Sequence, residues 1–364
     1  MKSNKQPAQS QRSNWLTLLA VISCISVVFL HTNGCYWEIP VSNPNWPGAN
    51  VIECLFYFAV PCFFMISGAN LFDYKERYTT KEYFIKRVKR TLLPYFVWST
   101  LAFVGEIVAQ VIMGDKMQFI DLSKINFVYI LNGYINSTFV EPYWFFIAIF
   151  VVYLFIPIIA NVNKQNRHKV ARYIALIGIL VNSLIPFILN VANVTGLTWS
   201  YVCDAVFGPI IYACIGYSIK NTNFKLKHEL PIYFFAIVGL LTHLLGTHYY
   251  SLLAGEIVQT FKGYYTPQTI AYSVGITLLV KRFGDKLMSN KLLPPPVNFL
   301  SRYTLSIYIT HIFSWGILYY LFSISPLGTT SLLYRLGGPF LIIPLSVGFT
   351  WLIRKIPYVR AILP

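Results

Sequence analysis

Three titratable side chains fall within long apolar stretches of the sequence, where ionisable groups are expensive and usually functional. His31 lies 16 residues beyond Trp15, which is about 24 Å along a helix. Glu106 lies the same 16 residues beyond Arg90, and His311 lies roughly 18 Å into a later stretch. We therefore expect the three groups to converge in the outer half of a helical bundle. A lone histidine in such a place is also often a hydrogen-bonded packing residue, so each is a candidate rather than a demonstrated catalytic group.

A second candidate is the basic run Lys-Arg-Val-Lys-Arg at 86–90, which leads into Leu-Pro-Tyr at 93–95. Arg87 and Arg90 are three residues apart and share one face of a helix. Two guanidinium groups in that arrangement can grip the phosphates of an anionic ligand that arrives from the cytoplasm. A basic cluster at a helix end is also an ordinary membrane anchor, and the sequence leaves both interpretations open.

The composition indicates which elements must position these residues. Of the 364 residues, 56% are hydrophobic and 12% are charged, against roughly 25% charged in an average soluble domain. A water-soluble chain of this length cannot solvate its surface with so few charges. The 17% of aromatic residues are typical of lipid-facing helices and interfacial belts.

Apolar stretches recur along the whole chain, and most approach the roughly 20 residues that a helix needs to cross a bilayer. No long soluble insert separates them. The sequence therefore predicts an all-α integral membrane protein with about ten transmembrane helices, built as a single domain over residues 1–364 with a short tail at 1–14. The ten stretches are 15–30, 51–72, 91–113, 143–160, 173–191, 200–219, 231–252, 266–280, 299–322 and 332–353.

Ten spans place both termini on one side, and the charges then divide sharply between the two sets of loops. Only Lys116, Lys124, Lys262 and Arg335 fall in one set, so the other set holds 25 of the 29 lysines and arginines. The positive-inside rule makes the basic side cytoplasmic. We predict a multi-pass plasma-membrane protein with cytoplasmic termini, whose net charge of +16 reflects topology and not nucleic-acid binding.

Two further features are the N-terminal segment and the cysteines. The basic N-terminus and first apolar stretch lack a small-residue cleavage site, so we expect the first helix to stay uncleaved. The six cysteines show no metal-binding spacing, and no metal site is predicted. Cys35 and Cys54 both lie near the expected outer face, where they can pair in an oxidising compartment.

Five segments, in order along the chain, resemble motifs of the acyltransferase family 3 membrane proteins, many of which acylate cell-surface carbohydrates. Two positions depart from the usual pattern: Ala20 stands where the family usually has a basic residue, and Pro142, beside Glu141, stands where it usually has histidine. The five segments are Val-Val-Phe-Leu-His at 27–31, Val-Pro-Cys-Phe-Phe-Met-Ile-Ser-Gly at 60–68, the basic run at 84–90 with its following Leu-Pro, Tyr-Trp-Phe-Phe at 143–146, and Leu-Ser-Ile-Tyr-Ile-Thr-His at 305–311.

The resemblance implies a donor of cytoplasmic acyl-CoA, most simply acetyl-CoA, with its phosphates on Arg87 and Arg90. The acyl group would reach His31, which would act as general base on an acceptor hydroxyl or carry the acyl group itself as a nucleophile. The acceptor would be a cell-envelope glycan or a lipid-linked sugar in or at the membrane lipid. Ala20 puts donor binding by the first helix in doubt.

The same resemblance implies supporting roles for other residues. Glu106 or Glu141 would orient His31, and His311 or Tyr308 would donate to the developing oxyanion. Glu141, Tyr143, Trp144 and Tyr308 are expected to contact substrate.

A different class of function also fits a bundle with buried polar groups: a transporter or flippase of a lipid-linked glycan, without acyl-transfer chemistry. Transporters often contain internal repeats, and the two halves of this sequence show none. A basic cytoplasmic patch beside a few charges at membrane depth favours a donor channel over alternating access.

Overall fold

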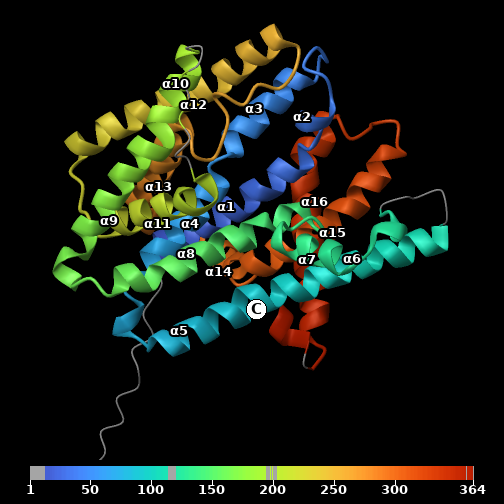
Figure 1. Cartoon of the computed structure of the whole chain (residues 1–364), viewed down its shortest axis with the longest axis horizontal. Coiled ribbons are helices and arrows are strands. Elements are labelled where there is room, and N and C mark those ends of the chain that lie inside the picture. The colour runs from blue at the N-terminus through green and yellow to red at the C-terminus, as the bar shows by residue number, and fades with distance from the viewer. Residues whose placement is uncertain are drawn as a thin grey trace, which may run out of the picture.

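The computed structural model describes residues 13–113, 120–193, 197, 199, 203–357 and 359–363, so nearly all of the predicted tail at 1–14 lies outside the described residues. Within those ranges the chain is helical and contains no strand. In Figure 1, α1 (Asn14–Thr32) crosses the middle of the molecule, while α5 (Thr80–Arg87) and α6 (Leu93–Met113) form one long rod along the lower edge.

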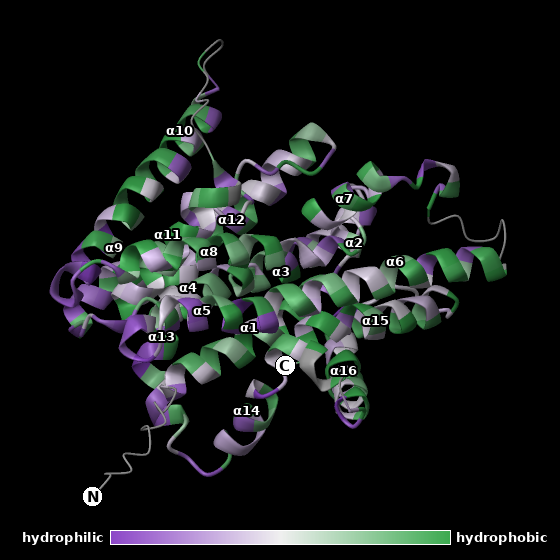
Figure 2. Cartoon of the chain, turned by 60° about the horizontal axis from the view of Figure 1, so that its bottom comes forward, coloured by the Kyte–Doolittle hydropathy of each residue, from purple (hydrophilic) through white to green (hydrophobic). Residues whose placement is uncertain are grey.

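Eight helical stretches are long and apolar enough to cross a membrane, which confirms the predicted all-α membrane class. The two other predicted stretches are also helical: α11 (Asp204–Lys220) and α13 (Pro267–Leu287). Figure 2 shows mostly hydrophobic residues along α6 and α10, with hydrophilic residues gathered around the start of α9 and the end of α13. The eight stretches are Asn14–Glu38, Trp46–Glu76, Thr80–Ile112, Glu141–Ala160, Lys164–Ala192, Leu226–Ala254, Thr304–Ser323 and Leu333–Arg354.

Helix α1 is the central element. It contacts α4 (Ala59–Leu71), α13, α15 (Thr304–Ser323) and α16 (Gly338–Arg354). A helix that is apolar all round belongs in the interior of a membrane protein, and its surroundings explain why the sequence of α1 shows no polar face. The other helices named below are α2 (Cys35–Glu38), α3 (Trp46–Phe56), α8 (Trp144–Ala160), α9 (Lys164–Ile179), α10 (Ile185–Ala192), α12 (Leu226–Ala254) and α14 (Pro294–Ser301).

Three π-helical turns each end two residues before a proline. Proline lacks a backbone N–H and its ring crowds the carbonyl of the preceding turn, so a wider turn relieves the clash. The first of these turns joins α5 to α6 and contains Arg90, with Arg87 directly before it. The three turns are Val88–Leu92 before Pro94, Leu180–Leu184 before Pro186 and Leu333–Gly337 before Pro339.

Helices α4 and α11 touch through glycines on both sides. A Cβ atom added to Gly68 would lie 1.9 Å from the carbonyl oxygen of Ala213, and one added to Gly216 would lie 2.1 Å from that of Met65. Small residues allow such close approach of two backbones in a membrane, where van der Waals contact drives helix association. Gly68 therefore serves close packing.

We expect Gly68→Ala to destabilise the protein by about 2 kcal/mol or more, because a methyl group there forces two backbones apart. The matched control is Gly105→Ala on α6, where an added Cβ meets nothing within 4 Å and alanine is the better helix former by up to about 1 kcal/mol. Thermal unfolding of both variants in the same detergent measures the difference. Equal midpoints for the two variants would contradict the close contact.

The loops that the charge pattern assigns to one side do meet at one end of the bundle. The backbone N–H of Trp15 donates to the Asp285 carboxylate at 3.3 Å, and Ser13, Lys86 and Lys220 line one cavity together with Arg77, Arg87, Arg90 and Ser301. Of the four cations in the charge-poor set, Lys262 and Arg335 are buried, each 1% exposed, Lys124 is exposed, and Lys116 lies outside the described residues.

The pairing of Cys35 with Cys54, which the sequence left open, is not formed. Both side chains are buried, and all six cysteines, which fall within the described residues, carry free thiols.

Candidate active site

His31 and His311 face each other at the point where α1 meets α15. Their ring centroids lie 4.9 Å apart at an angle of 48°. His311 is fully buried and His31 is half-buried. Two of the three titratable groups expected to converge therefore do so.

The backbone of α15 selects the tautomer of His311. Its Nδ1 lies 3.0 Å from the carbonyl oxygen of Ile307 and 2.7 Å from that of Tyr308. Because carbonyl oxygens only accept, Nδ1 carries the proton and Nε2 keeps its lone pair. That Nε2 atom is buried and has no hydrogen-bond partner among the described residues, so it is available as an acceptor.

Hydrogen bonds from two tyrosines join α15 to the start of α8. Tyr143 donates its hydroxyl proton to the carbonyl of Ile309 at 2.7 Å, and Tyr308 donates to the carbonyl of Pro142. Both bonds cross 166 residues of sequence. They hold the 3₁₀ turn Glu141–Tyr143 beside the helix that carries His311, and the Tyr308 ring lies 5.7 Å from the imidazole ring.

The remaining predicted site residues are less closely linked to the histidines. Glu141 is exposed and Trp144 is half-buried, with its ring 5.4 Å from that of Tyr264. Glu106 is half-buried on α6. Among the described residues, no hydrogen bond or ion pair joins Glu106 or Glu141 to either histidine, so their roles stay predictions.

A cavity of about 670 Å³ runs from the basic end of the bundle to Tyr308. The predicted phosphate-binding residues Arg87 and Arg90 both line it. Its lining near Tyr308 is apolar and includes Phe63 and Phe145. The cavity thus extends from the predicted phosphate-binding residues to Tyr308, whose ring lies beside that of His311.

Ala20, one of the two departures from the family pattern, also lines this cavity. A long basic side chain at this position of α1 would occupy space in the cavity, and alanine leaves that space open. The cations of this chain come from other elements instead: Arg77, Lys86 and Lys220 line the same cavity as Arg87 and Arg90.

Aromatic rings hold two of these cations in place. The Lys86 ammonium lies 3.9 Å from the centre of the Tyr78 ring, and the Arg87 guanidinium lies 5.9 Å from Tyr83 and 5.5 Å from Tyr153. Such cation–π contacts orient a side chain without neutralising its charge, so the mouth keeps its positive potential.

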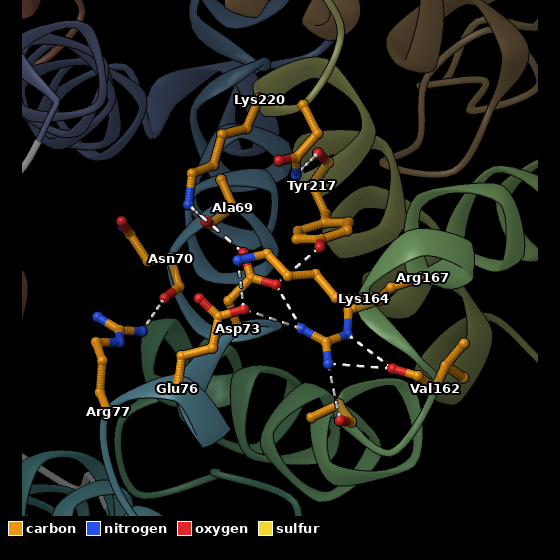
Figure 3. Close-up of polar contacts among 12 residues, drawn as sticks. Ala69, Asn70, Asp73, Glu76, Arg77, Val162, Lys164, Arg167, Tyr217 and Lys220 are labelled. Carbon is orange, nitrogen blue, oxygen red and sulfur yellow. Dashed lines mark hydrogen bonds and ion pairs between the residues drawn. The ribbon is translucent and has the colours of Figure 1, made fainter.

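Ion pairs and hydrogen bonds join the two carboxylates at the mouth of the cavity to residues of α9 and α11 (Figure 3). Asp73 accepts from Arg167 Nη1 at 2.6 Å and from the Tyr217 hydroxyl at 2.8 Å. Glu76 pairs with Lys164 at 2.9 Å. Both carboxylates line the mouth, so these partners offset negative charge that would otherwise repel an anionic ligand. This network was not predicted, because its members lie far apart in the sequence, with Arg167 on α9 and Tyr217 on α11.

We expect Arg167→Ala to cost about 3 kcal/mol of stability, because removing one member of a buried pair leaves the other charge uncompensated. The Arg167 side chain is only 6% exposed, and it also donates to the carbonyls of Ala160 and Val162. Lys164→Ala, at a side chain that is 70% exposed, should cost less than about 1 kcal/mol. Thermal unfolding of the two variants checks this order, and the reverse order would show that the network does not hold the mouth.

Fold and site together define a polytopic membrane protein in which a histidine pair adjoins a cavity with a basic mouth. A family model described as an acyltransferase domain, Acyl_transf_3, matches residues 13–354, and the chain belongs to this family. Membership confirms the resemblance predicted from the five motifs, and it implies acyl transfer rather than transport without chemistry. No curated protein and no solved structure matches the chain.

Proposed function

We propose that the protein transfers an acetyl group from cytoplasmic acetyl-CoA to a hydroxyl of an extracytoplasmic or lipid-linked glycan at the plasma membrane. Residues 1–364 would form one domain with both termini in the cytoplasm. The observation that carries this proposal is the cavity that leads from the Arg87 and Arg90 side chains to Tyr308, beside the two histidines.

Charge supports a coenzyme A donor. Five cations line the mouth, and the two carboxylates there are offset by Arg167 and Lys164. A ligand with several phosphate groups matches this potential, whereas a neutral metabolite gains nothing from it. The apolar inner part suits the pantetheine arm, which carries no charge.

The inner end of the cavity is formed by Tyr308, and neither histidine lines it. In our proposal the Tyr308 ring turns aside when the arm enters, which breaks its bond to the Pro142 carbonyl. The freed hydroxyl is then a donor for the oxygen of the thioester as negative charge develops on it.

His31 is the general base in this reaction. It takes the proton of the acceptor hydroxyl while that oxygen attacks the thioester carbon; the C–S bond breaks, and the departing thiolate recovers the proton. His311 accepts through Nε2 and so stabilises the imidazolium of His31. This role differs from the oxyanion donor first expected for His311, because Nδ1–H is already bound to the helix backbone.

Thiol release and product analysis test the proposal. Proteoliposomes that contain the full chain should release free thiol from acetyl-CoA when an extract of envelope glycans is present. Mass spectrometry should find acetyl esters on those glycans only from cells that make the protein. Glycans with the same acetylation in cells with and without the protein would refute the proposed acceptor class.

A further inference from the structure

A second polar cluster lies at the end of the bundle opposite the basic mouth. Its centre is Lys262, in the loop between α12 and α13, whose side chain is 0% exposed. The ammonium lies 3.2 Å from a carboxylate oxygen of Glu53 on α3. Three aromatic rings surround it, with centroids at 4.1 Å for Trp37 and Tyr57 and 5.1 Å for Tyr36. We call Glu53, Lys262 and these three rings the aromatic box.

The aromatic box is continuous with the catalytic region. Helix α2, which supplies two of its rings, begins four residues beyond His31. The Tyr57 ring stacks on Tyr264 at 4.3 Å, and Tyr264 lies 5.4 Å from Trp144. Trp144 directly follows the 3₁₀ turn Glu141–Tyr143, which is hydrogen-bonded to α15. The rings of Tyr57, Tyr264 and Trp144 therefore link the box to the start of α8, which is hydrogen-bonded to the helix that carries His311.

Several buried polar atoms around the box have no hydrogen-bond partner among the described residues. They are Oε2 of Glu53, the hydroxyls of Tyr36 and Thr247, and both ring nitrogens of His243. The His243 ring lies 5.3 Å from Tyr57. Buried polar groups in proteins are nearly always hydrogen-bonded, so this concentration of unpaired atoms indicates that a polar ligand completes the site.

We propose that the aromatic box is the subsite for the acceptor, and that its ligand is a sugar ring. A sugar hydroxyl both donates and accepts, so it can satisfy a carboxylate oxygen, an imidazole nitrogen and a phenol alike. The aromatic faces suit the C–H surface of a sugar. The proposal rests on the proposed function, for which the sugar supplies the reacting hydroxyl.

Lys262 now fills the centre of the aromatic box and must leave when a sugar enters. It is carried by a loop that begins at Gly255, whose φ of +73° is readily adopted only by glycine. Burial lowers the pKa of Lys262 and so reduces the cost of moving it, while Glu53 acts in the opposite direction. Trp37 is 49% exposed, so one wall of the box is open to the outside.

Binding of octyl β-D-glucoside to the full chain in lipid nanodiscs tests the subsite, with octyl tetraethylene glycol as a probe that has the same tail and no sugar ring. We expect the glucoside to bind at least 10-fold more tightly than the polyether. Trp37→Ala, and the double variant Glu53→Gln with Lys262→Met, should each abolish this preference. Trp351→Ala is the matched control, because Trp351 is similarly exposed and also contacts a lysine, yet it lies on α16 outside the box.

Equal binding of the two probes by the unmodified chain would overturn the subsite, as would a preference that survives in both variants. The double variant removes both charges together and so leaves no buried ion unpaired, which keeps the test decisive if Trp37→Ala does not fold. Thiol release from acetyl-CoA, measured on the same sample, reports separately on the proposed function: sugar binding without thiol release would refute the enzyme activity and leave the subsite standing.

Discussion

Replacing His31 with alanine should lower acetyl transfer by about 1,000-fold, within the range that a positioned general base contributes. The imidazole is the group in our mechanism that takes the acceptor proton, whereas the Nε2 atom of His311 accepts a hydrogen bond from His31 in that mechanism. The measurement is the rate of acetyl ester formation in proteoliposomes at saturating acetyl-CoA. Affinity for coenzyme A should change little, because the phosphate-binding mouth lies at the other end of the cavity.

His228→Ala is the matched control for this prediction. His228 is exposed near the start of α12 and should be replaceable without effect on the rate. Equal membrane abundance of the two variants separates lost chemistry from lost protein. A His31→Ala protein that still transfers acetyl at a tenth of the normal rate or more would exclude His31 as the base.

The helices were predictable because a membrane-spanning helix requires a long apolar stretch of sequence. Each of the ten apolar stretches corresponds to helical structure. Helix α13, whose predicted stretch of 15 residues was the shortest, extends to Leu287 through charged residues that lower its mean hydropathy. The π turns were not foreseen, although each lies at a fixed distance from a proline. That spacing is a local signal, and the clash behind it is predictable from backbone sterics.

Heights along helices predicted one contact of the catalytic region and not another. His31 and His311 meet as expected, since α1 and α15 pack together. Glu106 has a similar expected height but sits on α6, for which no contact with either histidine is found among the described residues. Spacing in the sequence gives the position of a residue along its helix. Which helices lie next to one another depends on packing, which cannot be deduced from a single sequence.

Charge counting predicts nothing about burial. Lys262 and Arg335 were counted in the charge-poor set of loops, and both are buried. The partner of Lys262, Glu53, lies more than 200 residues away in the sequence, and nothing local marks the pair. Counting charges by loop therefore could not reveal that the charge-poor set contains a buried ion pair.

The double variant Arg87→Gln and Arg90→Gln should raise the KM for acetyl-CoA by about 100-fold and change kcat much less. Hydrogen bonds to charged groups contribute about 1.5–3 kcal/mol each, and losing two of them at a phosphate accounts for that factor even when the losses are not additive. The phosphates bind far from the reacting thioester, so the saturated rate should persist. Steady-state kinetics of thiol release measure both constants.

The control is Lys225→Gln with Lys227→Gln, which removes two positive charges from exposed positions on the same predicted side and should leave the KM within about twofold. Added salt should weaken acetyl-CoA binding to the unmodified protein more than to the arginine variant, because screening acts on charges that the variant has lost. A protein with Arg87→Lys alone should bind acetyl-CoA less tightly than the unmodified protein, since an ammonium cannot reproduce the planar contact with Tyr83 and Tyr153. If the arginine variant kept both its KM and its salt dependence, the basic run would be a membrane anchor and the donor would bind elsewhere.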